Sequence, residues 1–164
     1  MDQEPDVPEV RSPTLDDLRR ICGSLEEQGA RYVLIGGFAV ILHGGERTTK
    51  DIDLLVEAGP DNVERIKRAL SILEDDAASE IEPGDLEKYV VVRVADEVLV
   101  DLLASACGVT WEEAHRSAGR VDLNGVSLVL ADVETLIRTK QTVRPSDAAD
   151  RAWLEALLDE RSSC

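Results

Sequence analysis

Two aspartates about a third of the way along the chain, Asp51 and Asp53, alternate with the apolar residues Ile52 and Leu54. Because side chains of a β-strand alternate between its two faces, the two acids would point from one face while the residues between them enter the core. Hard cations such as Mg²⁺ prefer oxygen ligands, and two carboxylates beside substrate phosphates form a common site for them. The pattern therefore predicts a divalent-metal site. The alternative is that Asp51 and Asp53 form the solvated face of an amphipathic edge strand.

A third carboxylate, Asp101, lies between Val100 and Leu102 in a run that is otherwise apolar. A charge in such a strand is costly unless a metal ion or another partner compensates it. Three carboxylates fit two-metal phosphoryl transfer, in which one ion activates the attacking oxygen and the other stabilises the leaving group. Asp101 is therefore a candidate third ligand.

A pair of glycines, Gly36 and Gly37, follows the apolar run at 31–35 and opens a short apolar segment. At the start of a helix, backbone amides and the helix dipole can hold a phosphate, and missing side chains allow its close approach. The alternative is a tight turn with no ligand.

Apolar runs and turn residues predict the elements that would position these groups. Strands are expected over 31–35, 51–57, 89–94 and 98–103, the last two as a hairpin, with another hairpin about Asn124-Gly125. Helices are expected from a Thr14 capping box to Gly29, over 38–42, from Pro60 to about Leu73, from Asp132 to about Val143, and from a Ser146 cap onward.

The length and composition suit one domain. The chain has 164 residues, of which 43% are hydrophobic, enough for an ordinary core. We expect a flexible N-terminal arm over 1–13, where three prolines and several charges show no periodicity, a single domain over 14–160, and a C-terminal tail over 161–164.

The charge balance is strongly acidic. Asp and Glu number 34 against 18 Lys and Arg, for a net charge of −16, which opposes diffuse binding to phosphate backbones or anionic membranes. No apolar run approaches a membrane span of roughly 18 residues, and the N-terminus lacks the pattern of a signal peptide. We therefore expect a cytoplasmic protein with no membrane partner. The three cysteines are too scattered to indicate a disulfide framework or a zinc site.

In order and content, these motifs resemble the nucleotidyltransferase superfamily built on the DNA polymerase beta catalytic core, especially its minimal members and the Abi-type toxin relatives. In that family a Gly-Gly or Gly-Ser turn begins a helix, an Asp-hydrophobic-Asp pair follows, and a third Asp lies on a later strand. Gly36, Gly37, Asp51, Asp53 and Asp101 match those positions. The resemblance covers about residues 14 to 160 and implies an α/β (α+β) nucleotidyltransferase fold, with a short mixed sheet flanked by helices.

Further matches extend the resemblance on both sides of the acids. Many relatives show His-Gly before Arg-x-Thr-x-Asp-hydrophobic-Asp, which here begins at His43 and includes Arg47 and Thr49. Near the C-terminus, Lys140 and Arg144 also match the family. One departure is Gly37, which replaces the serine that many members use to touch the nucleotide phosphates.

The resemblance implies magnesium-dependent attack by an acceptor hydroxyl or phosphate on the α-phosphorus of a nucleoside triphosphate, with release of pyrophosphate. Asp51, Asp53 and Asp101 would be the catalytic and metal-binding residues, with two Mg²⁺ ions, and Asp101 would help deprotonate the acceptor. The residues expected at the nucleotide are Gly36, Gly37, Arg47, Thr49, Lys140 and Arg144. For Lys140 and Arg144 the alternative is a favourable cation at a helix C-terminus.

The acceptor is left open between a small molecule, such as an antibiotic, an RNA and a protein. Because one compact domain leaves little room for an acceptor-binding module, a homodimer or a partner chain could complete the site, with Trp153 as an anchor. The competing hypothesis is a catalytically inactive protein of the same fold that binds a nucleotide or a partner protein, in a regulatory or toxin–antitoxin-like role.

Overall fold

The fold centres on a mixed β-sheet of six strands, seen in a computed structural model that describes residues 10–163. The strand order is β3-β4-β2-β1-β8-β7, so β3 and β7 form the two edges. The strands of this sheet are β1 (Tyr32–Ile35), β2 (Asp51–Val56), β3 (Val92–Ala95), β4 (Leu99–Leu103), β7 (Gly119–Leu123) and β8 (Val126–Leu130). A separate two-stranded sheet pairs β5 (Ser105–Ala106) with β6 (Val109–Thr110).

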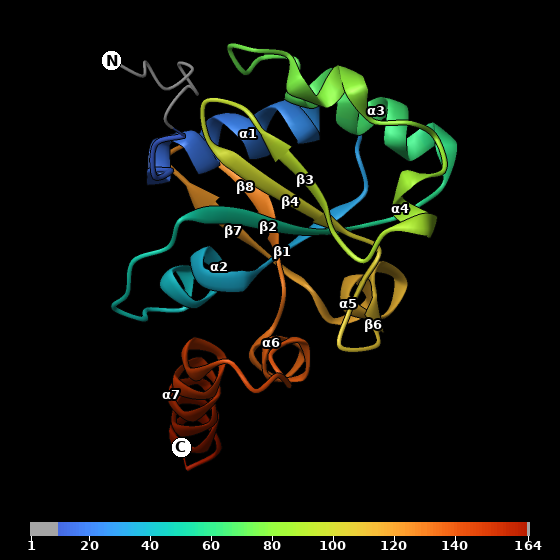
Figure 1. The fold of residues 1–164 in the computed structure, drawn as a ribbon. Coiled ribbons are helices and arrows are strands. Elements are labelled where there is room, and N and C mark those ends of the chain that lie inside the picture. Colours follow the sequence, from blue (N-terminus) through green and yellow to red (C-terminus); the bar gives the residue numbers. More distant parts are fainter. Residues whose placement is uncertain (1–9, 164) are drawn as a thin grey trace, which may run out of the picture.

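Parallel and antiparallel pairing alternate across the six-stranded sheet. Strand β2 runs antiparallel to β1 and parallel to β4, and β1 runs parallel to β8. The pairs β3–β4 and β7–β8 are the two expected hairpins. This arrangement, with its flanking helices, confirms the predicted α/β fold with a short mixed sheet (Figure 1).

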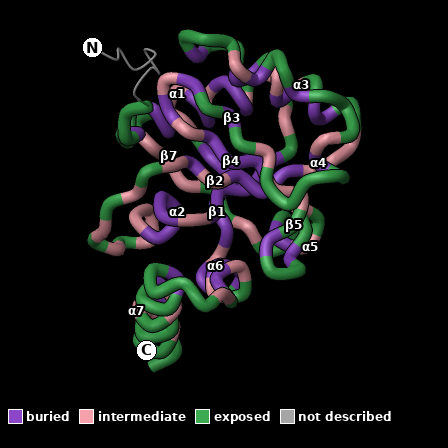
Figure 2. The backbone as a smooth tube through the Cα atoms, viewed as in Figure 1, coloured by how far each residue is buried: buried purple, intermediate pink, exposed green. Residues whose placement is uncertain are grey.

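Helices surround the sheet (Figure 1). They are α1 (Leu15–Glu27), α2 (Gly36–Leu42), α3 (Pro60–Leu70), α4 (Asp85–Lys88), α5 (Trp111–Ser117), α6 (Val133–Thr139) and α7 (Pro145–Ser162), with a 3₁₀ helix at Ala77–Glu80. Helices α1 and α3 pack against each other, α2 lies against β2, and α7 packs against α6. The tube in Figure 2 is mostly buried through the central strands β1, β2 and β4 and mostly exposed along α7.

The alternation of β2 separates the core from the acids. Ile52 and Leu54 are fully buried, as expected for the core-facing residues of this strand. The side chains of Asp51 and Asp53 point from the opposite face of the strand and are partly exposed. The N-terminal capping box of α1 is also present, because Thr14 Oγ1 accepts a hydrogen bond from the backbone N–H of Asp17 and the Asp17 carboxylate accepts one from the backbone N–H of Thr14.

Several predicted boundaries are wrong. Helix α6 ends at Thr139 instead of about Val143, and α7 has no Ser146 cap, because Pro145 occupies the first helical turn and Arg144 precedes it. A proline in the first turn has no N–H that needs a partner, and its fixed φ suits the start of a helix, so Pro145 favours this boundary. Strand β3 begins at Val92, and the residues at 89–91 are exposed before it.

The predicted termini are only partly covered by the structure. Of the expected arm, residues 1–9 lie outside the described residues, whereas Arg11 bonds to Asp17 and Glu97. At the other end, α7 continues through Ser162, so the first two residues of the expected tail are helical. Residue 164 is not described.

Candidate active site

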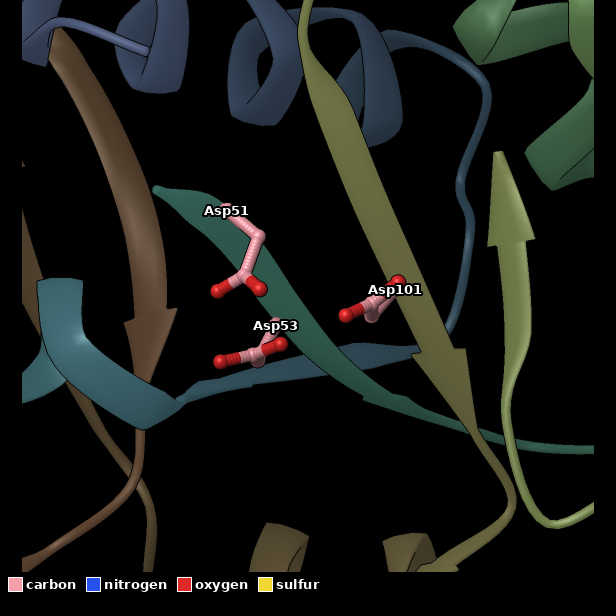
Figure 3. Close-up of side chains that lie close together, drawn as sticks. All are labelled: Asp51, Asp53 and Asp101. Carbon is pink, nitrogen blue, oxygen red and sulfur yellow. The ribbon is translucent and has the colours of Figure 1, made fainter. Parts of the chain in front are cut away.

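Three carboxylates from two neighbouring strands converge on one face of the sheet (Figure 3). Strands β2 and β4 pair in parallel with Asp53 directly opposite Asp101, and Asp51 lies two residues earlier on the same face. One carboxylate oxygen of each residue lies within 4.8 Å of the others. The separate motifs at Asp51, Asp53 and Asp101 thus form a single all-oxygen cluster, which is the donor set that hard divalent cations prefer.

The cluster is electrostatically costly without a cation. Burial, together with the charge of Asp101, raises the pKa of Asp51 above its usual range. Burial and then the charges of Asp51 and Asp101 raise the pKa of Asp53 to about 7. A bound divalent cation would reverse this effect, because it stabilises all three carboxylates in their charged form. The residues present therefore fit a metal site.

The glycine pair allows the chain to pass very close to this cluster. The register pairs Ile35 with Asp53, so the following Gly36 turns beside the Asp53 carboxylate with a φ of +75°. A Cβ on residue 36 would lie 2.1 Å from Asp53 Oδ2, which no side chain can tolerate. Gly36 is therefore required by the geometry of the acid cluster itself, whether or not a phosphate binds there.

The second glycine is explained by the loop that precedes β2. A Cβ on residue 37 would lie 2.7 Å from both Cβ and Oγ1 of Thr49 and 3.3 Å from Cζ of Arg47. In this protein the Thr49 side chain occupies the space that a serine at position 37 would need.

The four predicted cationic and polar nucleotide residues line the same cleft, and each already has a partner within the protein. Lys140 is buried at the end of α6, where its Nζ lies 2.9 Å from Asp150 Oδ2 and 3.7 Å from Asp147 Oδ1. Arg47 also donates to Asp150 Oδ2, so one carboxylate of α7 holds both cations.

Arg144 is held by the other acid of α7, because its Nη2 lies 3.1 Å from Asp147 Oδ2. It stands before the first turn of α7, so the alternative of a cation at a helix C-terminus does not apply to it. Burial alone would raise the pKa of Asp147, but the hydrogen bond from Thr142 and the charges of Lys140 and Arg144 lower that pKa below its usual value. Asp147 and Asp150 lie in the C-terminal stretch that the family resemblance covers, but the sequence alone predicts no role for them.

Arg93, on the edge strand β3, is a further residue at the acid cluster that the sequence motifs do not predict. The register places it directly opposite Asp101, and its guanidinium donates to both Asp101 oxygens at 2.8 Å. It also donates to Asp51 Oδ2 at 3.3 Å. The only signal for it was an arginine alternating with valines one strand before Asp101, a pattern that equally describes a solvated strand face.

All nine predicted site residues line one cleft of about 800 Å³. They are Gly36, Gly37, Arg47, Thr49, Asp51, Asp53, Asp101, Lys140 and Arg144. Its wall also includes Lys50, Arg93 and Asp147. His43, in contrast, points to the backbone, with Nε2 at 2.8 Å from the carbonyl oxygen of Ala131, which agrees with a structural role.

A short mixed sheet with three converging carboxylates on adjacent strands, flanked by a Gly-Gly turn and a cationic wall, defines the nucleotidyltransferase class of folds. Residues 14–160 match the model of a family described as nucleotidyl transferase of unknown function (DUF2204), and the chain belongs to that family. A crystal structure of a candidate nucleotidyltransferase from Thermotoga maritima has the same fold, with a TM-score of 0.54 at 15% identity, covering 89% of this chain and 92% of that one. A search of curated proteins found no match.

Among the described helices, none combines the length and the apolar character needed to cross a membrane.

Proposed function

We propose that this protein is a metal-dependent nucleotidyltransferase, which transfers the nucleoside monophosphate group of a triphosphate to an acceptor hydroxyl or phosphate. The observation that carries the proposal is the convergence of Asp51, Asp53 and Asp101 within 4.8 Å at the wall of the cleft. Membership of a nucleotidyl transferase family supports the same reaction.

The three carboxylates would hold Mg²⁺, two ions in this proposal, which would activate the attacking oxygen and stabilise the departing pyrophosphate. The acceptor oxygen bonds to the α-phosphorus, while the bond breaks between that phosphorus and the oxygen that joins it to the β-phosphorus. The acceptor proton passes to Asp101, and the electron pair of the broken bond leaves with pyrophosphate. Asp51 and Asp53 stay ionised throughout as ligands.

The triphosphate would lie along the opposite wall of the cleft. In this proposal it would be contacted by the backbone amides of Gly36 and Gly37, the Thr49 hydroxyl, and the side chains of Arg47, Lys140 and Arg144, all of which line the cleft. Because Asp147 and Asp150 hold the three cations, these side chains lose little conformational freedom when a phosphate binds.

The charges on the cleft wall indicate which charge the acceptor would carry. Five cationic residues, Arg47, Lys50, Arg93, Lys140 and Arg144, face four acids, Asp51, Asp53, Asp101 and Asp147, although the whole chain carries a net charge of −16. Three of the acids would be neutralised by metal. We therefore favour a neutral or anionic acceptor over a polycationic drug, with small molecule, RNA and protein as the classes to test.

Label transfer tests this function directly. The protein is incubated with Mg²⁺, a cell extract and each α-labelled triphosphate in turn, beside Asp53→Asn and the surface control Asp61→Asn. We expect label in a macromolecule or small product with the parent and with Asp61→Asn, and on the order of a hundredfold less with Asp53→Asn. Label in no product, or equal transfer by Asp53→Asn, would contradict the proposal and leave a nucleotide- or partner-binding protein.

A further inference from the structure

The acid cluster already contains a cation that belongs to the protein. The Arg93 guanidinium makes a two-pronged bond to Asp101, from Nε to Oδ1 and from Nη2 to Oδ2, each 2.8 Å long. Nη2 also reaches Asp51 Oδ2 at 3.3 Å. One positive charge therefore bridges two of the three acids that would bind metal.

This bridge uses the same oxygen atoms that a metal ion would need. A bidentate arginine directs its N–H groups at the lone pairs of both carboxylate oxygens of Asp101. A dication placed among Asp51, Asp53 and Asp101 would share those lone pairs and would also be repelled by the guanidinium charge. Occupation of the cluster by metal and its present contact with Arg93 are therefore in competition.

The Arg93 side chain is free to move without disturbing the core. It is 54% exposed, and β3 is an edge strand that contacts the rest of the sheet through β4 alone. The buried anchor of this strand is the neighbouring Val94. Arg93 can leave the carboxylates by side-chain rotation, with the strand pairing unchanged.

We propose that Arg93 is the resident counter-cation of the acid cluster, and that metal binding displaces it from Asp101. In the metal-free protein it offsets the repulsion among the three acids, and its charge lowers the affinity for the first divalent ion. Its departure also frees an Asp101 oxygen to accept the acceptor's proton. The inference rests on the proposed metal-dependent function, although its test measures metal binding itself.

The test is calorimetric titration of the metal-free protein with Mn²⁺, comparing the parent with Arg93→Gln, Arg93→Lys and Arg31→Gln. Arg31 is a matched control, because its side chain is 43% exposed and its Nη1 lies 2.8 Å from Glu57 Oε2. It lies next to β1, which pairs with β2 on the side away from β4, the strand that carries Asp101. For a single charge about 5 Å from a dication in a water-like medium, Coulomb's law gives roughly a tenfold effect. We expect Arg93→Gln to bind Mn²⁺ about tenfold more tightly, whereas Arg93→Lys and Arg31→Gln stay near the parent.

Thermal unfolding provides the second measurement. Without metal, Arg93→Gln should unfold at a lower temperature than Arg31→Gln, and saturating Mn²⁺ should remove that difference. Equal or weaker Mn²⁺ binding by Arg93→Gln would overturn the inference, while label transfer by the parent would still stand. If neither the parent nor Arg93→Gln binds Mn²⁺, both the inference and the proposed metal site are wrong.

Discussion

Lys140 and Asp150 form a buried ion pair, with Nζ of Lys140 2.9 Å from Oδ2 of Asp150, and the same carboxylate accepts a hydrogen bond from Arg47. The pair joins the end of α6 to α7, and Arg47 adds the loop that leads into β2. Helix α7, which otherwise packs mainly on α6, thus helps to position two cations of the cleft.

We predict that Asp150→Ala destabilises the fold. It would leave Lys140 buried, with Asp147 at 3.7 Å as its remaining acid, and would release Arg47. Removing one member of a buried pair leaves an uncompensated charge, so the free energy of unfolding should fall by about 3 kcal/mol. Urea unfolding measures this free energy, and the control is Asp159→Ala, at an exposed position of the same helix. Equal midpoints for the two variants would show that the ion pair contributes nothing.

Substitutions at Gly36 and Gly44 separate the effect of backbone strain from the effect of crowding against Asp53. Both have positive φ values, +75° and +107°, but a Cβ at Gly44 meets nothing within 4 Å, whereas at Gly36 it collides with Asp53. Gly44→Ala should cost about 1 to 2 kcal/mol through strain alone and leave Mn²⁺ binding intact. Gly36→Ala should cost more and abolish Mn²⁺ binding. Matching Mn²⁺ titrations of the two variants would rule out the close approach at Asp53.

The crowding between Gly37 and Thr49 predicts a non-additive pair. Gly37→Ser should destabilise the protein by about 1 to 3 kcal/mol, because the new side chain overlaps Thr49. In a Thr49→Gly background the same change should cost at least about 1 kcal/mol less. A double-mutant cycle by urea unfolding measures the coupling. A coupling near zero would mean that the loop shifts at no cost.

The raised pKa of Asp53, about 7, predicts a stability change with pH in the metal-free protein. Between about pH 4 and 7 the unfolded state releases this proton before the folded state does, so the contribution of Asp53 to stability falls as pH rises. Asp53→Asn should therefore unfold at a higher temperature than the parent at pH 8, by a few degrees, with little difference at pH 4. Thermal scans in a chelator test this. A less stable Asp53→Asn at pH 8 would contradict it.

Strand alternation made part of the site predictable from sequence, because it requires Asp51 and Asp53 to share one face of their strand. Asp101 was predictable as a charged residue between apolar neighbours in a strand. The pairing of β2 with β4, which sets Asp53 opposite Asp101, could not be read from residues so far apart in the chain. Arg93 was missed for the same reason, since only the β3–β4 register distinguishes it from a solvated arginine. The partners of Lys140 depend on the angle between α6 and α7, which local patterns do not determine.

The most direct measurement compares α-labelled and γ-labelled triphosphate in one reaction with Mg²⁺ and a cell extract. We predict that the α-label enters an acceptor product while the γ-label appears as pyrophosphate, and that both signals disappear with a chelator and with Asp53→Asn. Transfer of the γ-label to an acceptor, or transfer of the α-label that persists in Asp53→Asn, would contradict nucleotidyl transfer at the three aspartates.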